Sequence, residues 1–371
     1  MMKREASILV MATLALVSTG VLMVYSISAV KSPSGVQFKT ELVYVALGVT
    51  AMFLLAHVDY HYLRRPGVYR SFALLVFLLL VLVLIPGIGV ERNGAQRWLR
   101  IFQFQFQPSE FAKFAVILLL AVKLTENQDH IQSFSRGFLP PIAVTASFAL
   151  LILLENDLGM PMMVMCIAFM MVFTAGARWR YLLASSAPII AGFIALSVTS
   201  AHRLPRLFAY LDPWRYAEKE SYQLVQSLTA FARGAIWGCG LGAGEQKLWY
   251  LPEADTDFIF SIIGEEMGLV GALMLATLYA ALTVAAFRIA VNARDLFGAL
   301  LATGIVSMIA FQAAFIMAMT TGLLPTKGLP LPFVSYGGTA LIVSLMLMGL
   351  LINIGRQAQE PHKKPLFARA A

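Results

Sequence analysis

The stretch Tyr250-Leu-Pro-Glu-Ala-Asp-Thr-Asp-Phe-Ile-Phe260 places three carboxylates in a short loop directly before a long apolar run. That run is long enough to cross a bilayer, because about 20 helical residues span the hydrocarbon core. The three acids, Glu253, Asp255 and Asp257, are therefore expected where water meets lipid. Carboxylates at such a depth, at the mouth of a helix bundle, suit proton transfer on a membrane-bound substrate.

The composition of the chain excludes a water-soluble globular protein. Of its 371 residues, 59% are hydrophobic and only 13% are charged, so it has too little polar surface to cover a soluble domain. The net charge of +8 suits a protein flanked by anionic lipid, and no nucleic acid is needed to explain it. The two cysteines, Cys166 and Cys239, predict no disulfide framework.

Long apolar runs predict an all-α polytopic membrane protein with about ten transmembrane helices. Each segment that would face the cytoplasm is basic when the N-terminus is placed there, and an even number of spans puts both termini inside. The first run is too long for a signal peptide and further spans follow, so we expect it to be retained. Residues 1–371 are therefore expected to form one transmembrane domain. The predicted spans are residues 6–28, 38–58, 71–90, 109–124, 138–154, 159–175, 180–200, 257–287, 296–321 and 331–354.

Two outer loops carry cations against this charge pattern. The first, residues 91–108, contains Arg97 and Trp98; the second, residues 201–256, is a large extracytoplasmic loop between spans seven and eight. Outward cations indicate an anionic ligand on that face. The alternative is that long loops cross the membrane regardless of charge and that these cations contact only water or lipid phosphates. Within the large loop, residues 222–236 have the spacing of an amphipathic helix lying on the membrane.

Charged residues also occur inside predicted spans. Glu110 and Lys113 are three residues apart, so they share one face of the fourth span. Either an ion pair that fixes helix packing or a role in ligand binding explains them. In the eighth span, Glu265 and Glu266 are interpreted as polar contacts between helices that glycines allow to pack closely. For Asp257 the simpler alternative is a charge that stabilises a helix N-terminus.

The segment 321–338 is punctuated by proline and glycine and dips into the tenth span. Irregular backbone at membrane depth persists only where it is buried in protein or lines a cavity. Its polar side chains are Lys327, Ser335 and Tyr336. A structural kink is the alternative to a functional role.

These stretches resemble the SEDS family, the shape, elongation, division and sporulation membrane proteins that polymerise peptidoglycan. The resemblance covers nearly the whole chain and is closer to the division-type FtsW branch than to the RodA branch. The motifs that carry it are Asn93-Gly-Ala-Gln-Arg-Trp98, Phe106-Gln-Pro-Ser-Glu-Phe-Ala-Lys113, Leu211-Asp-Pro-Trp214, Tyr222-Gln-Leu-Val-Gln-Ser-Leu228, Gln246-Lys247, Tyr250-Leu-Pro-Glu253, Thr256-Asp-Phe-Ile-Phe260, Gly264-Glu-Glu266 and Leu331-Pro-Phe-Val-Ser-Tyr-Gly-Gly338.

The resemblance implies an enzyme that joins lipid II molecules into glycan strands at the outer face of the cytoplasmic (inner) membrane, for the division septum or for cell shape. The aspartate of the family's Thr-Asp-Phe motif is the catalytic one, which here is Asp257. Its expected role is that of a general base for the acceptor hydroxyl, in a single inverting displacement. Trp98, Glu110 and Lys113 match further functional positions of the family.

The same resemblance suggests residues that contact the substrate. We expect Arg97, Lys113 and Lys247 to stabilise the departing pyrophosphate, because an anionic leaving group requires positive charge. Lys327 and Ser335 are expected to line the same binding site.

One residue departs from the family pattern. Asp255 stands where many members carry histidine, which places a second carboxylate two residues before Asp257. A divalent cation, Mg²⁺ or Mn²⁺, held by both is therefore left open, and no other cofactor is expected. The implied partners are a class B penicillin-binding transpeptidase, other membrane proteins of the division or elongation machinery, and membrane lipid.

A lipid II flippase is the alternative function from a different class, because intramembrane charges and irregular loops also suit a transporter. A flippase needs a charged path through the bilayer. The charges of this chain gather on the outer side, and spans five, six, seven and nine are nearly uncharged. This asymmetry favours an enzyme.

Overall fold

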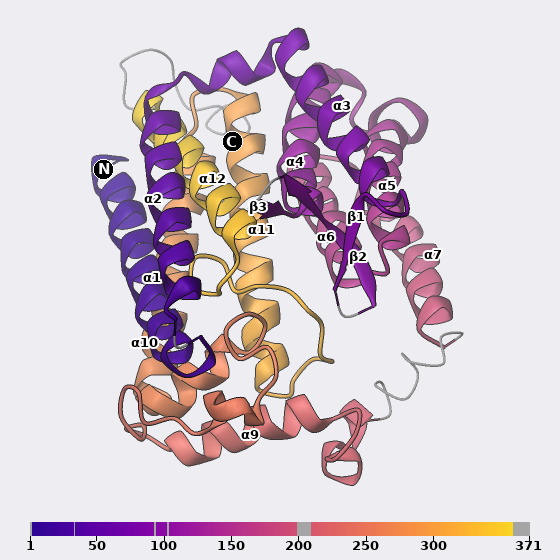
Figure 1. Cartoon of the computed structure of the whole chain (residues 1–371). Helices are drawn as coiled ribbons and strands as arrows, with labels where there is room; N and C mark the ends of the chain where they lie inside the picture. The colour runs from indigo at the N-terminus through magenta and orange to yellow at the C-terminus, as the bar shows by residue number, and fades with distance from the viewer. Residues whose placement is uncertain (1, 33, 93, 102–103, 199–208, 359–371) are drawn as a thin grey trace.

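The computed structural model describes the chain outside residues 1, 33, 93, 102–103, 199–208 and 359–371. Most of the described chain is helical, and the long helices run side by side in one bundle (Figure 1). The helices of the bundle are α1 (Met2–Lys31), α2 (Val36–His57), α3 (Pro66–Val83), α4 (Pro108–Glu126), α5 (Leu139–Leu154), α6 (Gly159–Thr174), α7 (Trp179–Val198), α10 (Ile259–Val291), α11 (Leu296–Thr320) and α12 (Gly338–Gln357), and a further helix is α9 (Tyr222–Gly234). Short helical turns are η1 (Tyr60–Arg64), η2 (Gln128–His130), η3 (Phe134–Phe138), η4 (Pro213–Tyr216) and η5 (Gln246–Tyr250).

The predicted polytopic, all-α membrane fold is confirmed. Among the described residues, α1, α2, α3, α10, α11, α12 and the segment Phe134–Leu154 are each long and apolar enough to cross a membrane. Helix α6 is apolar but shorter, and α4 and α7 fall outside that set. The count of ten spans therefore stays a prediction.

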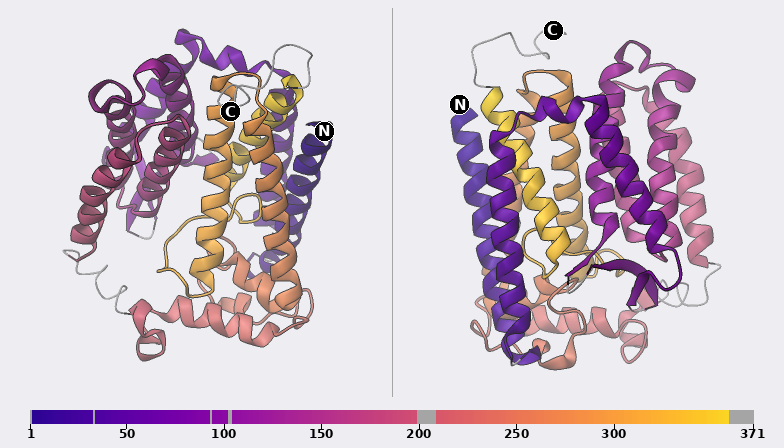
Figure 2. Two further views of the ribbon diagram at one scale, coloured as in Figure 1. Left: turned by 180° about the vertical axis from the view of Figure 1, so that it is seen from behind. Right: turned by 45° about the horizontal axis from the view of Figure 1, so that its top comes forward.

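The two ends of the bundle differ. Helix α1 begins and α12 ends at the same end of the bundle, whereas α9 lies across the opposite end (Figures 1 and 2). We call the end with α9 the outer end, following the prediction from loop charge. Residues 199–208, at the start of the predicted large loop, lie outside the described residues.

Residues 222–236 were predicted to form an amphipathic helix, and α9 (Tyr222–Gly234) is that helix. Its apolar face contacts protein. Phe231 of α9 stacks edge-on against Phe260 of α10, with ring centroids 5.6 Å apart. The Ser227 hydroxyl donates to the Thr320 carbonyl of α11 (2.6 Å) and also contacts the Ser261 hydroxyl of α10 (2.6 Å). The apolar face is therefore buried against α10 and α11, and is not free to enter lipid as the sequence suggested.

The segment between α3 and α4 contains a three-stranded antiparallel sheet that was not predicted. Its strands are β1 (Gly89–Arg92), β2 (Ala95–Ile101) and β3 (Phe104–Phe106), in the order β1-β2-β3. Successive side chains of a strand point to opposite faces. Arg97 therefore shares a face of β2 with the buried Ala95 and Leu99. Trp98 lies on the other face, opposite Val90 of β1.

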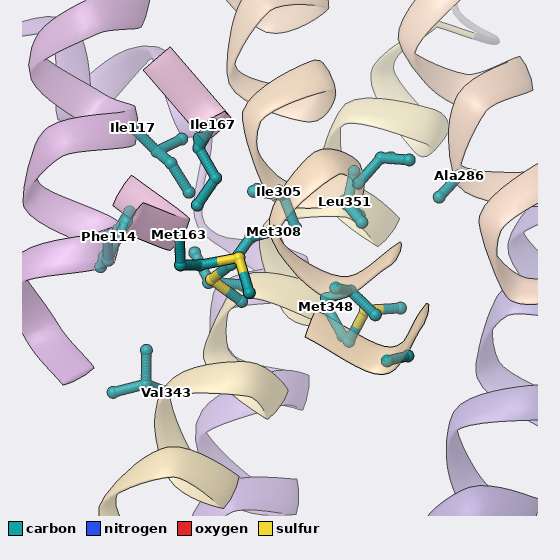
Figure 3. Close-up of a cluster of buried hydrophobic side chains, with 14 of the residues drawn as sticks. Phe114, Ile117, Met163, Ile167, Ala286, Ile305, Met308, Val343, Met348 and Leu351 are labelled. Carbon is teal, nitrogen blue, oxygen red and sulfur yellow. The ribbon is translucent and has the colours of Figure 1, made fainter. Parts of the chain in front are cut away.

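The core of the bundle lies around α12. Of an apolar stretch of 18 residues in each helix, 89% is buried in α12 and 17% in α2. Helix α12 is therefore central and α2 is peripheral. Figure 3 shows the cluster where α4, α6, α10, α11 and α12 contribute Phe114, Ile117, Met163, Ile167, Ala286, Ile305, Met308, Val343, Met348 and Leu351.

The second half of the irregular segment between α11 and α12, residues 329–335, is largely buried in protein, which is one of the two settings that the sequence allowed, the other being the lining of a cavity. Gly20 of α1 packs so closely on this segment that a Cβ there would lie 2.7 Å from the Val334 carbonyl oxygen. The hydroxyl of Tyr279, on α10, donates to the Pro332 carbonyl. The buried side chains include Phe333, whose backbone is left-handed with φ 68°. This re-entrant segment (residues 325–337) brings polar backbone close to the start of α10.

Helix α10 is interrupted at Gly268, which has φ 64° and ψ −164°. The break frees the carbonyls of Glu265 and Glu266, which accept from the amides of Cys239 (3.0 Å) and Gly240 (3.1 Å). A Cβ at Gly268 would lie 2.4 Å from a backbone nitrogen, so this position requires glycine. The glycine-rich loop is thereby fixed to the outer part of α10.

Candidate active site

Asp257 lies in the turn that precedes α10, at the outer end of the bundle. Its carboxylate is half-buried and, among the described residues, receives no hydrogen bond and makes no ion pair within contact distance. Gly328 of the re-entrant segment packs against it, since a Cβ there would lie 3.0 Å from Asp257 Oδ2. The absence of a side chain at Gly328 thus leaves room beside the carboxylate.

Burial is the main reason that the pKa of Asp257 rises from its usual value to about 7. The nearby Glu253 carboxylate raises this pKa further, and Asp157 and Asp255 act in the same direction, whereas Arg97 lowers it. A carboxylate that exchanges its proton near neutral pH is suited to general base catalysis.

Arg97 is held beside this aspartate by the turn between α5 and α6. Its Nη2 donates to the Asn156 carbonyl (2.9 Å), and its Nη1 lies 3.4 Å from Asp157 Oδ2. The other oxygen of Asp157 accepts from the first amides of α6, at Gly159 (2.9 Å) and Met160 (3.3 Å). The Nε of Arg97 is buried without an acceptor in the described part of the chain. The guanidinium is therefore oriented by two contacts, and one of its donors has no acceptor among the described residues.

The turn of Glu155, Asn156 and Asp157 was missed by the sequence analysis, which took these residues as a gap between spans five and six. Two carboxylates in so short an outer turn between apolar runs were a usable signal. What the sequence did not reveal is that β2 brings Arg97 to this turn.

The ion pair predicted on α4 is confirmed. Lys113 Nζ lies 2.8 Å from Glu110 Oε2, and both side chains are only 1% exposed. Lys113 also donates to Gln312 Oε1 of α11 (3.1 Å), and Gln312 donates to the Pro330 carbonyl (2.6 Å). Apart from the ion contact, neither Glu110 oxygen accepts a hydrogen bond from a described residue. The pair therefore links α4 and α11 to the re-entrant segment, and its contact with substrate stays a prediction.

Asp255 is occupied by the connection between α1 and α2. Its two oxygens accept from Lys31 Nζ (2.9 Å) and Gln37 Nε2 (2.6 Å), and its carbonyl accepts from the Tyr336 amide (2.8 Å). Across the described ranges, no three His, Cys, Asp or Glu side chains are grouped to hold a metal ion. Both Asp255 oxygens already accept from neighbouring side chains and the described residues offer no third acidic, His or Cys ligand, so these residues do not fit the predicted site as they stand. We derive no step through a metal.

Ser335 connects the re-entrant segment to the acidic turn. Its hydroxyl donates to the Thr256 carbonyl (2.5 Å) and accepts from the Leu331 amide (2.8 Å). Lys327 is half-buried nearby in the same segment, and its backbone amide contacts the Met319 sulfur (3.0 Å). Ser335 is thus placed to hold the turn of Asp257, while substrate contact by Ser335 and Lys327 stays a prediction.

Lys247 forms a buried ion pair with Glu266, separate from Asp257. Its ammonium donates to Glu266 Oε1 (2.6 Å) and Ser26 Oγ (2.7 Å). Glu265 accepts from the backbone amides of Glu245 (2.9 Å) and Gln246 (3.1 Å). The interpretation of Glu265 and Glu266 as structural contacts is confirmed. The Lys247 ammonium is committed to that contact, so a role in stabilising pyrophosphate stays a prediction.

The chain is a polytopic helical membrane protein with a half-buried carboxylate, Asp257, at one end of its bundle. A family profile, that of the FtsW/RodA/SpoVE cell cycle proteins, matches residues 6–360. The chain belongs to this family.

Individual relatives match along almost their full length. The chain is 41% identical to the probable peptidoglycan glycosyltransferase FtsW of Geobacter sp. (strain M18), over 94% of this chain and 95% of the relative. It is also 41% identical to stage V sporulation protein E of Bacillus subtilis (strain 168), over 95% of this chain and 97% of the relative. These similarities support the FtsW-like branch that the motifs indicated.

Solved structures give the same grouping. A chain from a peptidoglycan synthase complex that coordinates polymerization and crosslinking superposes with a TM-score of 0.78 at 28% identity, covering 95% of this chain and 98% of that one. The rod shape determining protein RodA of Thermus thermophilus superposes with a TM-score of 0.69 at 28% identity, covering 95% and 97%.

Proposed function

We infer that this protein is a peptidoglycan glycosyltransferase that polymerises lipid II. The observation that carries the inference is Asp257, a half-buried carboxylate that receives no hydrogen bond from the described residues and lies within electrostatic reach of Arg97. Its position before α10, at the outer end of a membrane-embedded bundle, suits a substrate whose polar part is tethered to the membrane by a lipid. The names of the relatives support the same activity.

Asp257 would act as the general base. The proton of the acceptor's sugar hydroxyl passes to the Asp257 carboxylate as the hydroxyl oxygen bonds to the anomeric carbon of the donor. The bond from that carbon to the pyrophosphate breaks, and its electron pair leaves with the pyrophosphate. One displacement of this kind inverts the anomeric carbon. A positioned base contributes about 10²- to 10⁴-fold to such a step.

Arg97 would stabilise the leaving group. Asn156 and Asp157 hold two of its nitrogens, and the buried Nε–H has no acceptor among the described side chains and carbonyls. A pyrophosphate oxygen is a suitable acceptor for that donor. A pre-oriented cation stabilises negative charge as it develops, without the cost of reorganising water.

The remaining parts of the proposal concern place and partners. We place the enzyme in the cytoplasmic membrane with both termini inside, at the division septum, and working with a class B penicillin-binding transpeptidase. The likeness to a chain of a complex that couples polymerization and crosslinking supports such a partner.

The experiment that tests this proposal is polymerisation of purified lipid II by the protein in detergent, with its cognate transpeptidase supplied. Wild type is compared with Asp257→Ala and Asp255→Ala, and each variant's folding is checked by gel filtration. We expect glycan strands from wild type and Asp255→Ala, and none from Asp257→Ala. Strands from a well-folded Asp257→Ala would refute the assigned base.

The flippase alternative is separated by a second readout on the same preparations. Vesicles containing the protein are tested for movement of labelled lipid II between leaflets. Movement of lipid II without any strand formation by wild type would replace the polymerase with a transporter.

A further inference from the structure

Glu155, directly after α5, is a buried acid that the proposed mechanism does not use. Its side chain is 1% exposed, and both carboxylate oxygens are buried without a hydrogen-bond donor in the described part of the chain. The charged groups that act on it are Asp157, in its own turn, and Arg97, on β2. An isolated buried carboxylate is too costly to keep charged and takes up a proton instead.

Burial and the neighbouring Asp157 also favour the protonated form of Glu155. Burial, and then the negative charge of Asp157, raise the pKa of Glu155 to about 9, while Arg97 acts in the opposite direction. Glu155 is therefore a neutral carboxylic acid at physiological pH, and it ionises only as the pH rises through about 9.

The contacts of Arg97 show why the neutral form matters. Arg97 makes its ion contact with Asp157, whereas Glu155 is not among its ion-pair partners. With a single carboxylate in contact, the guanidinium keeps its charge, which acts on Asp257, and an Nε–H without an acceptor among the described residues. A second ionised carboxylate in the same turn would compete for that donor and neutralise the cation.

We propose that Glu155 is a positioning residue that acts through Arg97: by holding a proton, it leaves the Arg97 cation available to the pyrophosphate of the lipid-linked substrate. This inference rests on the proposed glycosyltransferase function and deepens it. It gives the two acids of the α5–α6 turn different roles: Asp157 makes the ion contact with Arg97, and Glu155 holds a proton.

The test is the pH profile of lipid II polymerisation by wild type and Glu155→Gln. Glutamine has the shape of the protonated acid and cannot ionise, so we expect rates within about twofold at pH 7.5. Above pH 9 the wild-type rate should fall by about tenfold per pH unit, and that fall should be absent in Glu155→Gln. Glu126→Gln, which alters an exposed glutamate of α4, should follow the wild-type profile.

A second measurement does not depend on activity. At pH 7.5 the infrared difference spectrum of wild type minus Glu155→Gln should show the carbonyl stretch of one protonated carboxylic acid that the variant lacks. A wild type that makes no strands would overturn the proposed function itself. A wild type that makes strands but keeps the same alkaline fall in Glu155→Gln, or shows no such band, would overturn the role of Glu155 alone.

Discussion

Two acidic regions at the start of α10 look alike in sequence and differ in what surrounds them. Glu266 accepts from Lys247, Ser26 and the Gly242 amide, and Glu265 beside it accepts from backbone amides. Asp257, eight residues before Glu265, receives no hydrogen bond from any described residue. Glu265 and Glu266 therefore have hydrogen-bond or ion-pair partners, whereas Asp257 has none among the described residues.

The partners of a buried acid distinguish a structural role from a reactive one. A buried carboxylate that has a cation and several donors helps to fix the structure around it. Removing one of these partners lowers the stability of the protein. A carboxylate left without donors is costly to bury, and such carboxylates are concentrated at functional sites. The predictions below test the comparison from both sides.

The largest expected effect falls on stability, in the partnered region. Lys247→Ala leaves the Glu266 carboxylate buried without its cation, and should lower the free energy of unfolding by about 3–5 kcal/mol. Thermal unfolding in detergent, followed by tryptophan fluorescence, measures it. Lys39→Ala removes an exposed lysine of α2 and should change little. Equal stability of the two variants would contradict a structural role for this pair.

Removing the Arg97 cation, which acts on Asp257, should lower the reaction rate more than the stability of the protein. Arg97→Ala should lower the turnover number by about 10²- to 10³-fold, because one stabiliser of the leaving group is lost. Arg97→Lys should recover only part of it, since lysine lacks the planar fork that Asn156 and Asp157 hold. Arg100→Ala, on the opposite face of β2, is the matched control. A loss of stability without a change in turnover would assign Arg97 to the frame.

The raised pKa of Asp257 predicts an acidic limb in the rate profile. A general base must be deprotonated, so polymerisation should increase as the pH rises through about 7 and fall by about tenfold per unit well below it. Initial rates between pH 5 and 8 measure this limb. A rate that is constant down to pH 5 would mean that Asp257 is not the titrating base.

The smallest effect is expected at Asp255. Asp255→Asn loses the ion pair with Lys31 but keeps acceptor and donor atoms for the α1–α2 connection. The rate should stay within about threefold and the stability within about 1–2 kcal/mol. Polymerisation with and without a chelator is measured alongside. A loss as large as that of Asp257→Ala, reversed by added Mg²⁺ or Mn²⁺, would instead support a metal shared by the two aspartates.

The parts of the molecule that depend on local periodicity could be predicted from the sequence. The apolar runs predicted the bundle, and the spacing of Glu110 and Lys113 predicted their pair, because residues three apart share a helical face. The proline and glycine pattern predicted the buried segment before α12, since irregular backbone at membrane depth needs protein around it.

The parts that were missed depend on tertiary contacts. The short strands of residues 89–106 were not predicted, although Phe104-Gln-Phe106 and the residues on either side alternate apolar and polar side chains, which is the pattern of a strand. Arg97 meets Asp157 across 60 residues of chain, and Lys247 meets Ser26 across 221. No spacing within one helix or strand predicts such pairs.

The role of Asp257 as the base is tested on Asp257→Asn, which keeps the size of the side chain and removes its basicity. Binding of lipid II and the initial rate of strand formation are measured on the same preparation at pH 7.5. We predict near wild-type affinity with a rate reduced by about 10²-fold or more. A well-folded Asp257→Asn that polymerises lipid II at the wild-type rate would contradict the assignment of the unpartnered carboxylate as the base.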